Sequence, residues 1–444
     1  MSDVTSTSEM KRRAFLQLCA AGSLTSLLAA CQTTSGTIDS VNTRPASTAK
    51  PASTATATAT KPPVATEQDW AALAQRLQGT LVRPGNTQYA TALQLYDPRF
   101  DTIHPAGIAY CNGVADLQAC LEFAHRFAVP VAPRSGGHSY AGYSTTTGLV
   151  LDVTRMNGTT VNNAAQTATV DAGARLVDVY AALTNQGVII PAGSCPTVGI
   201  AGLTLGGGVG VIGRKYGLTC DSLLSADVVL ADGRVVTCDS SHYADLFWGL
   251  RGGGGGNFGV VTKFTFRTNT VSALSLFTLR WPWSSAAQVV DAWQNWAPSA
   301  PDEIWSNCVL LTTADPNAGP IVQVNGVYVG SSSALSPLLQ QLTSSIGVSP
   351  SSNYVTDASV MDTMLYEAGC SGKSIAACHL PTQNPQGQLP RTIEDAKSDY
   401  FNHVLSRAGI GVLVNAISSR QVATTPGTVG IGIDPYGGAI SRVQ

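Results

Sequence analysis

The chain has 444 residues, with 26 lysines and arginines against 28 aspartates and glutamates, and 44% of its residues are hydrophobic. The balanced charge gives no electrostatic sign of nucleic-acid binding, which calls for a basic stripe or patch, and no sign of a highly charged substrate. The length and the apolar content are sufficient for two domains, each with a core of its own.

The N-terminal segment has the pattern of an export signal. Arg12 and Arg13 precede an apolar stretch that ends at Ala30, which is too short to span a membrane as a helix but suits a signal peptide. The arginine pair resembles a twin-arginine signal, although an ordinary secretory signal also carries positive charge here. Leu28–Cys31 resembles a bacterial lipobox, and the alternative is that Cys31 only follows a cleavage site. We expect residues 1–31 to direct export across a bacterial inner membrane, with a lipid anchor at Cys31 and a periplasmic or cell-surface location.

Residues 32–66 are dominated by Thr, Ser, Ala and Pro and contain almost no large apolar side chains. Such a segment cannot bury enough surface to offset the entropy of ordering it. We therefore expect a disordered linker here.

The rest of the sequence predicts an α+β protein. Helices are expected at 67–77, 116–127, 176–184, 285–296 and 334–346, where apolar residues recur at helical spacing. Strands are expected at 129–132, 149–153, 168–172, 260–266, 277–281, 309–313 and 321–329. Val228–Val236 contains two β-rich runs around Asp232-Gly233, which predicts a hairpin.

The ten cysteines contain no C-x-x-C pair, which argues against structural zinc, and we predict no metal site. Cys370 and Cys378 are close enough for a local disulfide in an oxidising compartment. The pairing is not fixed by the sequence. Five further cysteines, Cys111, Cys120, Cys220, Cys238 and Cys308, suit small buried apolar positions.

Two glycine-rich segments carry the chemical signal. Arg134–Tyr140 places His138 among glycines and serines, and Gly193–Gly199 does the same for Cys195. Glycine permits close approach of the main chain to a flat, phosphorylated cofactor. Taken singly, His138 could be an exposed loop residue, and Cys195 a buried thiol or half of a disulfide.

Together the two segments resemble the berberine bridge enzyme-like branch of the vanillyl-alcohol oxidase family, whose members hold FAD through two covalent bonds. The resemblance implies a PCMH-type FAD-binding domain of two subdomains over residues 90–269. A partial substrate domain with an antiparallel sheet and flanking helices would follow over 270–444. It further implies that His138 bonds the 8α-methyl carbon of the flavin and Cys195 bonds C6. The complete activity would be oxidation of an alcohol or a carbohydrate hydroxyl, with dioxygen as the acceptor.

The resemblance also supplies further cofactor-binding candidates. These are Arg134, Ser135, Gly136, Gly137, Ser139, Val198, Gly199, Gly202, Leu205, Gly206, Gly207, Gly208, Gly210, Gly259 and Val261. By analogy with the plant branch, a valine at position 198 implies access of dioxygen; the plain alternative is a core valine. The resemblance also includes Leu250–Thr262, expected near the adenine and ribitol side of FAD; the plain alternative for its glycine run is a flexible linker between domains.

A nicotinamide-binding alternative comes from Gly208, Gly210 and Gly213, which fit G-x-G-x-x-G, with Asp232 at a suitable distance beyond. However, no clear strand precedes these glycines, and Asp232 falls at the tip of the predicted hairpin. A non-catalytic surface binding protein is the other alternative.

Near the end, Ile433–Ile440 again resembles the family, and Asp434 is the catalytic candidate that would orient or accept a substrate proton. A turn-forming aspartate before proline is the plain alternative. Relative to the family, the chain is expected to be truncated after Gln444, so that the general base would be missing.

Overall fold

The computed structural model describes residues 62–271, 273–315, 318–421 and 427–442. The predicted export signal and most of the predicted linker lie outside these residues. None of the helices within the described ranges combines the length and the apolar character that crossing a membrane requires.

The first sheet of the N-terminal domain has four strands in the order β1-β2-β4-β3. The strands are β1 (Thr80–Val82), β2 (Gly107–Tyr110), β3 (Val131–Arg134) and β4 (Leu149–Asp152). Strand β4 runs parallel to β2 and β3, while β1 is antiparallel to β2. Helices α2 (Glu67–Arg76), α3 (Tyr89–Ala92) and α4 (Val114–Phe127) accompany this sheet. The predicted apolar face of α4, from Leu117 to Ala124, is buried as expected.

The second sheet has five antiparallel strands in the order β5-β6-β10-β8-β9. They are β5 (Thr159–Asn162), β6 (Thr167–Asp171), β8 (Leu223–Val229), β9 (Val235–Asp239) and β10 (Val260–Arg267). Helices α5 (Leu176–Thr184), α6 (Ile200–Leu205), α7 (Gly213–Tyr216) and α8 (Ala244–Leu250) belong to this part, and β7 (Val188–Ile189) pairs with β11 (Asn269–Thr270). The predicted Asp232-Gly233 hairpin joins β8 to β9, so that prediction is confirmed.

One apolar core joins these two subdomains. It contains Trp70 and Leu73 from α2 together with Phe264 and Phe266 from β10. Packing of the FAD-binding part therefore begins before residue 90, where the sequence placed its start.

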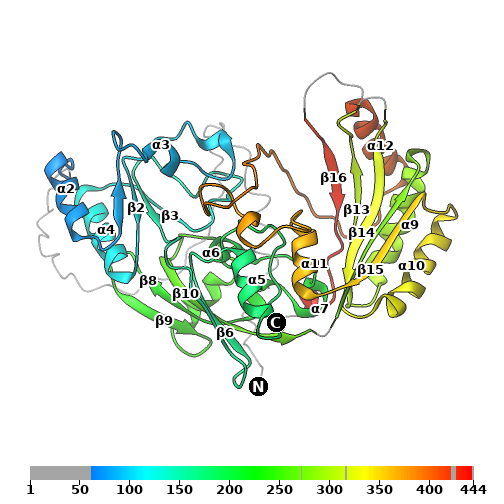
Figure 1. The fold of residues 1–444 in the computed structure, drawn as a ribbon, viewed down its shortest axis with the longest axis horizontal. Coiled ribbons are helices and arrows are strands. Elements are labelled where there is room, and N and C mark those ends of the chain that lie inside the picture. The colour runs from blue at the N-terminus through cyan, green and yellow to red at the C-terminus, as the bar shows by residue number, and fades with distance from the viewer. Residues whose placement is uncertain (1–61, 272, 316–317, 422–426, 443–444) are drawn as a thin grey trace, which may run out of the picture. The chain divides into compact units, whose positions relative to one another are not determined.

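The C-terminal domain is an antiparallel sheet of five strands in the order β15-β12-β14-β13-β16. The strands are β12 (Leu274–Trp281), β13 (Ile304–Leu311), β14 (Ile321–Tyr328), β15 (Ser352–Ala358) and β16 (Gly430–Ile433). The helices are α9 (Ala286–Trp296), α10 (Ser332–Ile346), α11 (Val360–Glu367), α12 (Arg407–Gln421) and α13 (Ala439–Arg442). Side chains of α9, α10 and α12 form the core against this sheet, and α9 and α10 lie side by side on it (Figure 1).

The cysteines fall into three groups. Cys370 and Cys378 form a disulfide with Cα atoms 5.9 Å apart, as the sequence suggested. Among the described residues, Cys111, Cys120, Cys220, Cys238 and Cys308 are buried and form no disulfide, whereas Cys195 is exposed.

Candidate functional site

The two glycine-rich segments meet in space. The Nε2 atom of His138 lies 2.7 Å from the hydroxyl of Thr197, which stands two residues after Cys195. The Cys195 segment is fixed in turn to the start of α5, because the amide of Val177 donates to the Pro196 carbonyl at 3.1 Å. The imidazole and the thiol are therefore positioned by the same pair of interlocked loops.

Glycines make this interlocking possible. A Cβ atom on Gly136 would lie 2.1 Å from the amide nitrogen of Gly199, and a Cβ atom on Gly199 would lie 2.0 Å from the Ser135 hydroxyl. Real Cβ atoms do not approach so closely. Gly136 and Gly199 thus serve the packing of one loop on the other, a role the sequence analysis did not foresee.

His138 is held as a neutral imidazole. Its ring stacks on Tyr96 with centroids 3.9 Å apart and an interplanar angle of 19°. Burial, reinforced by the positive charge of Arg175, lowers the pKa of His138 to about 4. Among the described residues Thr197 is its hydrogen-bond partner, at Nε2; in the tautomer whose Nε2–H donates to the Thr197 hydroxyl, Nδ1 keeps a lone pair that can act as a nucleophile.

Cys195 reaches the surface of the site, yet its thiol is poorly ionised. Surrounding protein raises the pKa of Cys195 by desolvation, and the carboxylate of Glu394 raises it further. Both desolvation and Glu394 disfavour the thiolate form of Cys195. In this respect Cys195 differs from the cysteines of redox enzymes, whose pKa is lowered.

Two arginines beside the site present unsatisfied donors. Arg134 Nε donates to Asp152 Oδ2 at 2.6 Å, and both side chains are buried. Arg134 Nη1 and Arg175 Nε are buried without a hydrogen-bond partner. Since buried N–H groups are nearly always paired, these donors fit an anionic group such as the phosphates of FAD.

The second glycine run begins as a helix. Gly199 caps α6, which runs from Ile200 to Leu205, and a Cβ atom on Gly202 would meet nothing within 4 Å. Open space of this kind suits the approach of a cofactor. By contrast, a Cβ atom on Gly210 would lie 1.7 Å from the Ala192 carbonyl oxygen, so Gly210 serves packing inside the protein.

The remaining predicted residues of this class fall into two groups. Those that mainly form turns or pack within the domain are Gly137, Ser139, Leu205, Gly208, Gly259 and Val261. Those with more open surroundings are Gly206 and Gly207. Val198 is half-buried and packs against the core.

The nicotinamide-binding alternative does not fit the structure. The glycines from 208 onward follow helix α6 instead of a strand. Asp232 is exposed at the hairpin tip, where it pairs with Arg234 at 2.7 Å. Asp232 therefore does not stand at the end of a parallel strand, where the ribose-binding acid of this motif would be.

Asp434 follows β16 in a turn that packs on the N-terminal domain. Arg214 of α7 donates to the carbonyl of Tyr436 at 3.3 Å and to that of Ala300 at 2.7 Å. Asp434 remains accessible to solvent, but desolvation raises the pKa of its carboxyl group. Tyr400 lies edge-on to Tyr436 with centroids 5.4 Å apart, which gives the turn an aromatic wall. Arg214 comes shortly after the glycine-rich run 199–210, so its hydrogen bonds connect the turn after β16 to that part of the first domain.

Four contributors to the site escaped the sequence analysis as individual residues: Tyr96, Arg175, Thr197 and Glu394. Thr197 stood within a quoted motif, and its hydroxyl two positions after Cys195 was the available signal. The other three come from distant segments with no motif around them.

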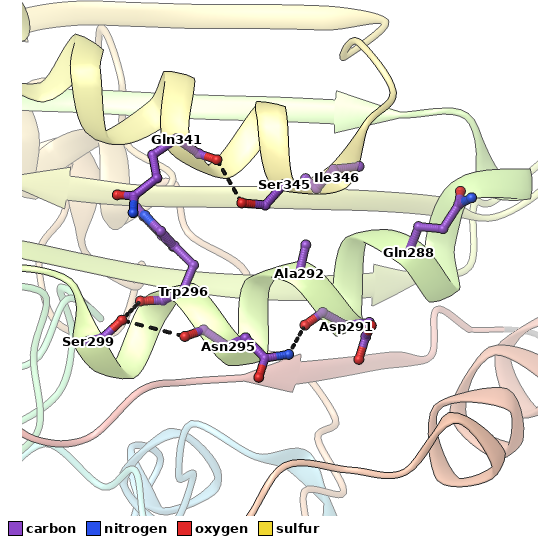
Figure 2. A pocket seen from close by; sticks show the side chains of 9 residues that line it. All are labelled: Gln288, Asp291, Ala292, Asn295, Trp296, Ser299, Gln341, Ser345 and Ile346. Atoms are coloured by element: carbon purple, nitrogen blue, oxygen red, sulfur yellow. Dashed lines mark hydrogen bonds between the residues drawn. The ribbon is translucent and has the colours of Figure 1, made fainter.

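A polar groove of about 440 Å³ lies elsewhere, between α9 and α10 (Figure 2). Its polar side chains largely bond to their own helices, as when Asn295 donates to the Asp291 carbonyl at 2.7 Å and Ser345 to that of Gln341 at 2.9 Å. None of the predicted site residues lines it.

The geometry agrees with comparisons to known proteins. Residues 105–239 match a family model described as an FAD binding domain. The structure superposes on BBE-like 1 of Physcomitrella patens with a TM-score of 0.74 and 31% identity, covering 84% of this chain and 79% of that one. This chain belongs to the berberine bridge enzyme-like family of FAD-linked oxidoreductases.

Two curated relatives of this BBE-like chain match it over about half of its length. An uncharacterized FAD-linked oxidoreductase of Bacillus subtilis, YgaK, is 38% identical over 54% of this chain and 53% of its own length. A xylooligosaccharide oxidase of Thermothelomyces thermophilus is 36% identical over 54% of this chain and 48% of its own. The chain thus spans about half the length of these curated relatives.

Proposed function

We propose that this protein oxidises an alcohol or a carbohydrate hydroxyl, using FAD bonded to both His138 and Cys195. The observation that carries the proposal is the 2.7 Å contact between His138 and Thr197, which holds the two reactive side chains in one site. The unpartnered donors of Arg134 and Arg175 support an anionic cofactor there. FAD would supply the acceptor for a hydride from the substrate.

The protein residues would hold the cofactor and manage protons. Neutral His138 offers Nδ1 for the bond to the 8α-methyl carbon, because Nε2 is engaged by Thr197. Cys195 would bond C6. Asp434, whose pKa is raised by desolvation, would orient the hydroxyl or accept its proton.

A carbohydrate is the substrate class with most support. A xylooligosaccharide oxidase and a chitooligosaccharide oxidase are among the relatives at 36% identity, each matching about half of this chain. The exposed rings of Tyr400 and Tyr436 beside Asp434 also suit the apolar face of a sugar. Dioxygen is the proposed acceptor, on the strength of Val198.

The test is anaerobic mixing of the purified protein with oligosaccharides, polyols and simple alcohols while flavin absorbance is followed. We expect oligosaccharides to bleach the flavin, and admission of dioxygen to restore the colour with release of hydrogen peroxide. Bound flavin that none of these compounds bleaches would favour the non-catalytic binding protein instead.

We also propose export across a bacterial inner membrane and a lipid anchor at Cys31, on the pattern of residues 10–31. A Cys31→Ala variant should then move from the membrane fraction to the soluble periplasmic fraction. Equal distribution of both forms would count against the anchor.

A further inference from the structure

A segment of the C-terminal domain crosses to the site. We call residues 379–395 the crossing segment; it lies between α11 and α12 and reaches the residues that follow α3 (Figure 1). At its start, His379 Nε2 lies 3.0 Å from Asp178 Oδ2 of α5. Further along, Arg391 donates to the Leu95 carbonyl at 2.6 Å and pairs with Asp101. Anchors at both ends fix the course of the segment.

Glu394 stands at the end of the crossing segment, inside the site. Its backbone amide donates to Asp97 Oδ2 at 3.3 Å, and the Tyr96 hydroxyl donates to Glu394 Oε1 at 3.2 Å. Desolvation and the nearby Glu394 carboxylate also raise the pKa of the Tyr140 phenol. Since the Tyr96 ring stacks on His138, the carboxylate is connected to the imidazole through one phenol.

Glu394 also faces the second reactive residue. Among the described residues, it is the charged group that acts on Cys195, while the phenols of Tyr96 and Tyr140 are the other titratable groups that face the thiol. A carboxylate opposes formation of a second negative charge nearby. Desolvation raises the pKa of the Cys195 thiol most, and this repulsion raises it further, so the two together limit the reactivity of the exposed thiol toward oxidants and electrophiles.

We infer that Glu394 is a positioning residue of the flavin site, which fixes Tyr96 against His138 and holds Cys195 as an unreactive thiol while no cofactor is bound. The inference rests on the proposed function, because it explains how an exposed cysteine stays available for flavin. A thiolate in an oxidising compartment would instead be converted to sulfenic acid or higher oxides.

The test measures alkylation of Cys195 by iodoacetamide in the full chain, produced without flavin in riboflavin-starved cells. The Cys195 peptide is quantified by mass spectrometry at a series of pH values. At pH about 8 we expect Glu394→Gln to react about threefold to tenfold faster than the wild type, because removal of the charge lowers the pH at which the thiol ionises. Glu394→Asp, which keeps the charge, should stay closer to the wild type.

Asp395→Asn is the matched control. It removes the same charge from the adjacent residue, whose exposed side chain pairs with Arg99 at 3.6 Å. Arg391→Ala, which releases the crossing segment, provides a second variant in case Glu394→Gln fails to fold, and it should also accelerate alkylation. Wild-type rates in both Glu394→Gln and Arg391→Ala, or an equal acceleration in Asp395→Asn, would overturn the inference. Because the measurement uses flavin-free protein, its outcome is separate from whether Cys195 bonds flavin.

Discussion

Thr197 holds the imidazole of His138 across a distance of 2.7 Å, and this contact joins two loops that lie far apart in the sequence. The hydroxyl engages Nε2, and no protein hydrogen bond to Nδ1 is seen among the described residues. The same loop presents Cys195. One hydrogen bond thus couples the orientation of one reactive residue to the placement of the other.

Removal of the Thr197 hydroxyl should weaken the site. We expect Thr197→Val to lower the free energy of unfolding by about 1 kcal/mol and to reduce the fraction of protein that carries covalent flavin. Thr145→Val is the control, since the Thr145 hydroxyl is buried without a partner. Urea denaturation and flavin fluorescence in denaturing gels give the two readouts. Equal behaviour of the two variants would show that the contact with His138 has no energetic role.

The buried ion pair of Arg134 and Asp152 gives a second prediction. Arg134→Ala would leave Asp152 charged and buried, and we expect a loss of about 3–5 kcal/mol in stability. Arg234→Ala breaks a pair with Asp232 whose side chains are 65% and 53% exposed, and should cost far less stability. Chemical denaturation compares the two. Similar small losses would mean that the buried pair is not needed for folding.

Val198 gives a prediction about dioxygen. If access runs past this half-buried side chain, Val198→Leu should reduce peroxide release while anaerobic bleaching of the flavin by substrate is unchanged. Val235→Leu, on the exposed outer strand β9, should leave both rates as they are. A normal rate of peroxide release in Val198→Leu would show that dioxygen reaches the flavin by another route.

His379 gives a prediction about pH. Burial disfavours its charged form, but the hydrogen bond and charge of Asp178, together with the Ile375 carbonyl, outweigh burial, so the pKa of His379 is raised. A raised pKa stabilises the folded state below the unfolded value of about 6.5, and the contribution is lost as pH rises through the folded pKa.

His379→Gln should therefore destabilise the protein more at pH about 5.5 than at pH about 9, as measured by thermal unfolding. His242→Gln, in the exposed pair with Asp239, is the control and should cost little stability, because exposed ion pairs contribute little. A pH-independent loss in His379→Gln would assign its effect to packing alone.

Local signals in the sequence predicted much of the fold. Helix α5 has the bounds expected from its apolar spacing, and the hairpin turns at the expected Asp232-Gly233, where Gly233 has a positive φ. Helix α6 was not predicted. It has only six residues, and the three glycines after Leu205 make the helical spacing of its apolar residues hard to recognise. Strand β15 and helices α11 and α12 were also missed; α12 begins with two glycines among its first five residues.

The sequence predicted only those site residues that stand within a recognisable motif. His138 and Cys195 stood in recognisable segments, whereas Tyr96 and Glu394 are brought together by a contact between residues 298 positions apart. The mutual packing of Gly136 and Gly199 is likewise a tertiary relationship. The periodicity of residues within one segment cannot predict a contact between two distant segments. These contacts are therefore seen only in the folded chain.

The most direct test of the double attachment is flavin absorbance of the acid-precipitated, washed protein in the wild type, His138→Ala, Cys195→Ala and the double variant. We predict a yellow pellet for the wild type and for each single variant, with altered spectra in the singles, and a colourless pellet for the double variant. A colourless wild-type pellet, or a double variant that stays yellow, would contradict bonding of FAD through these two residues.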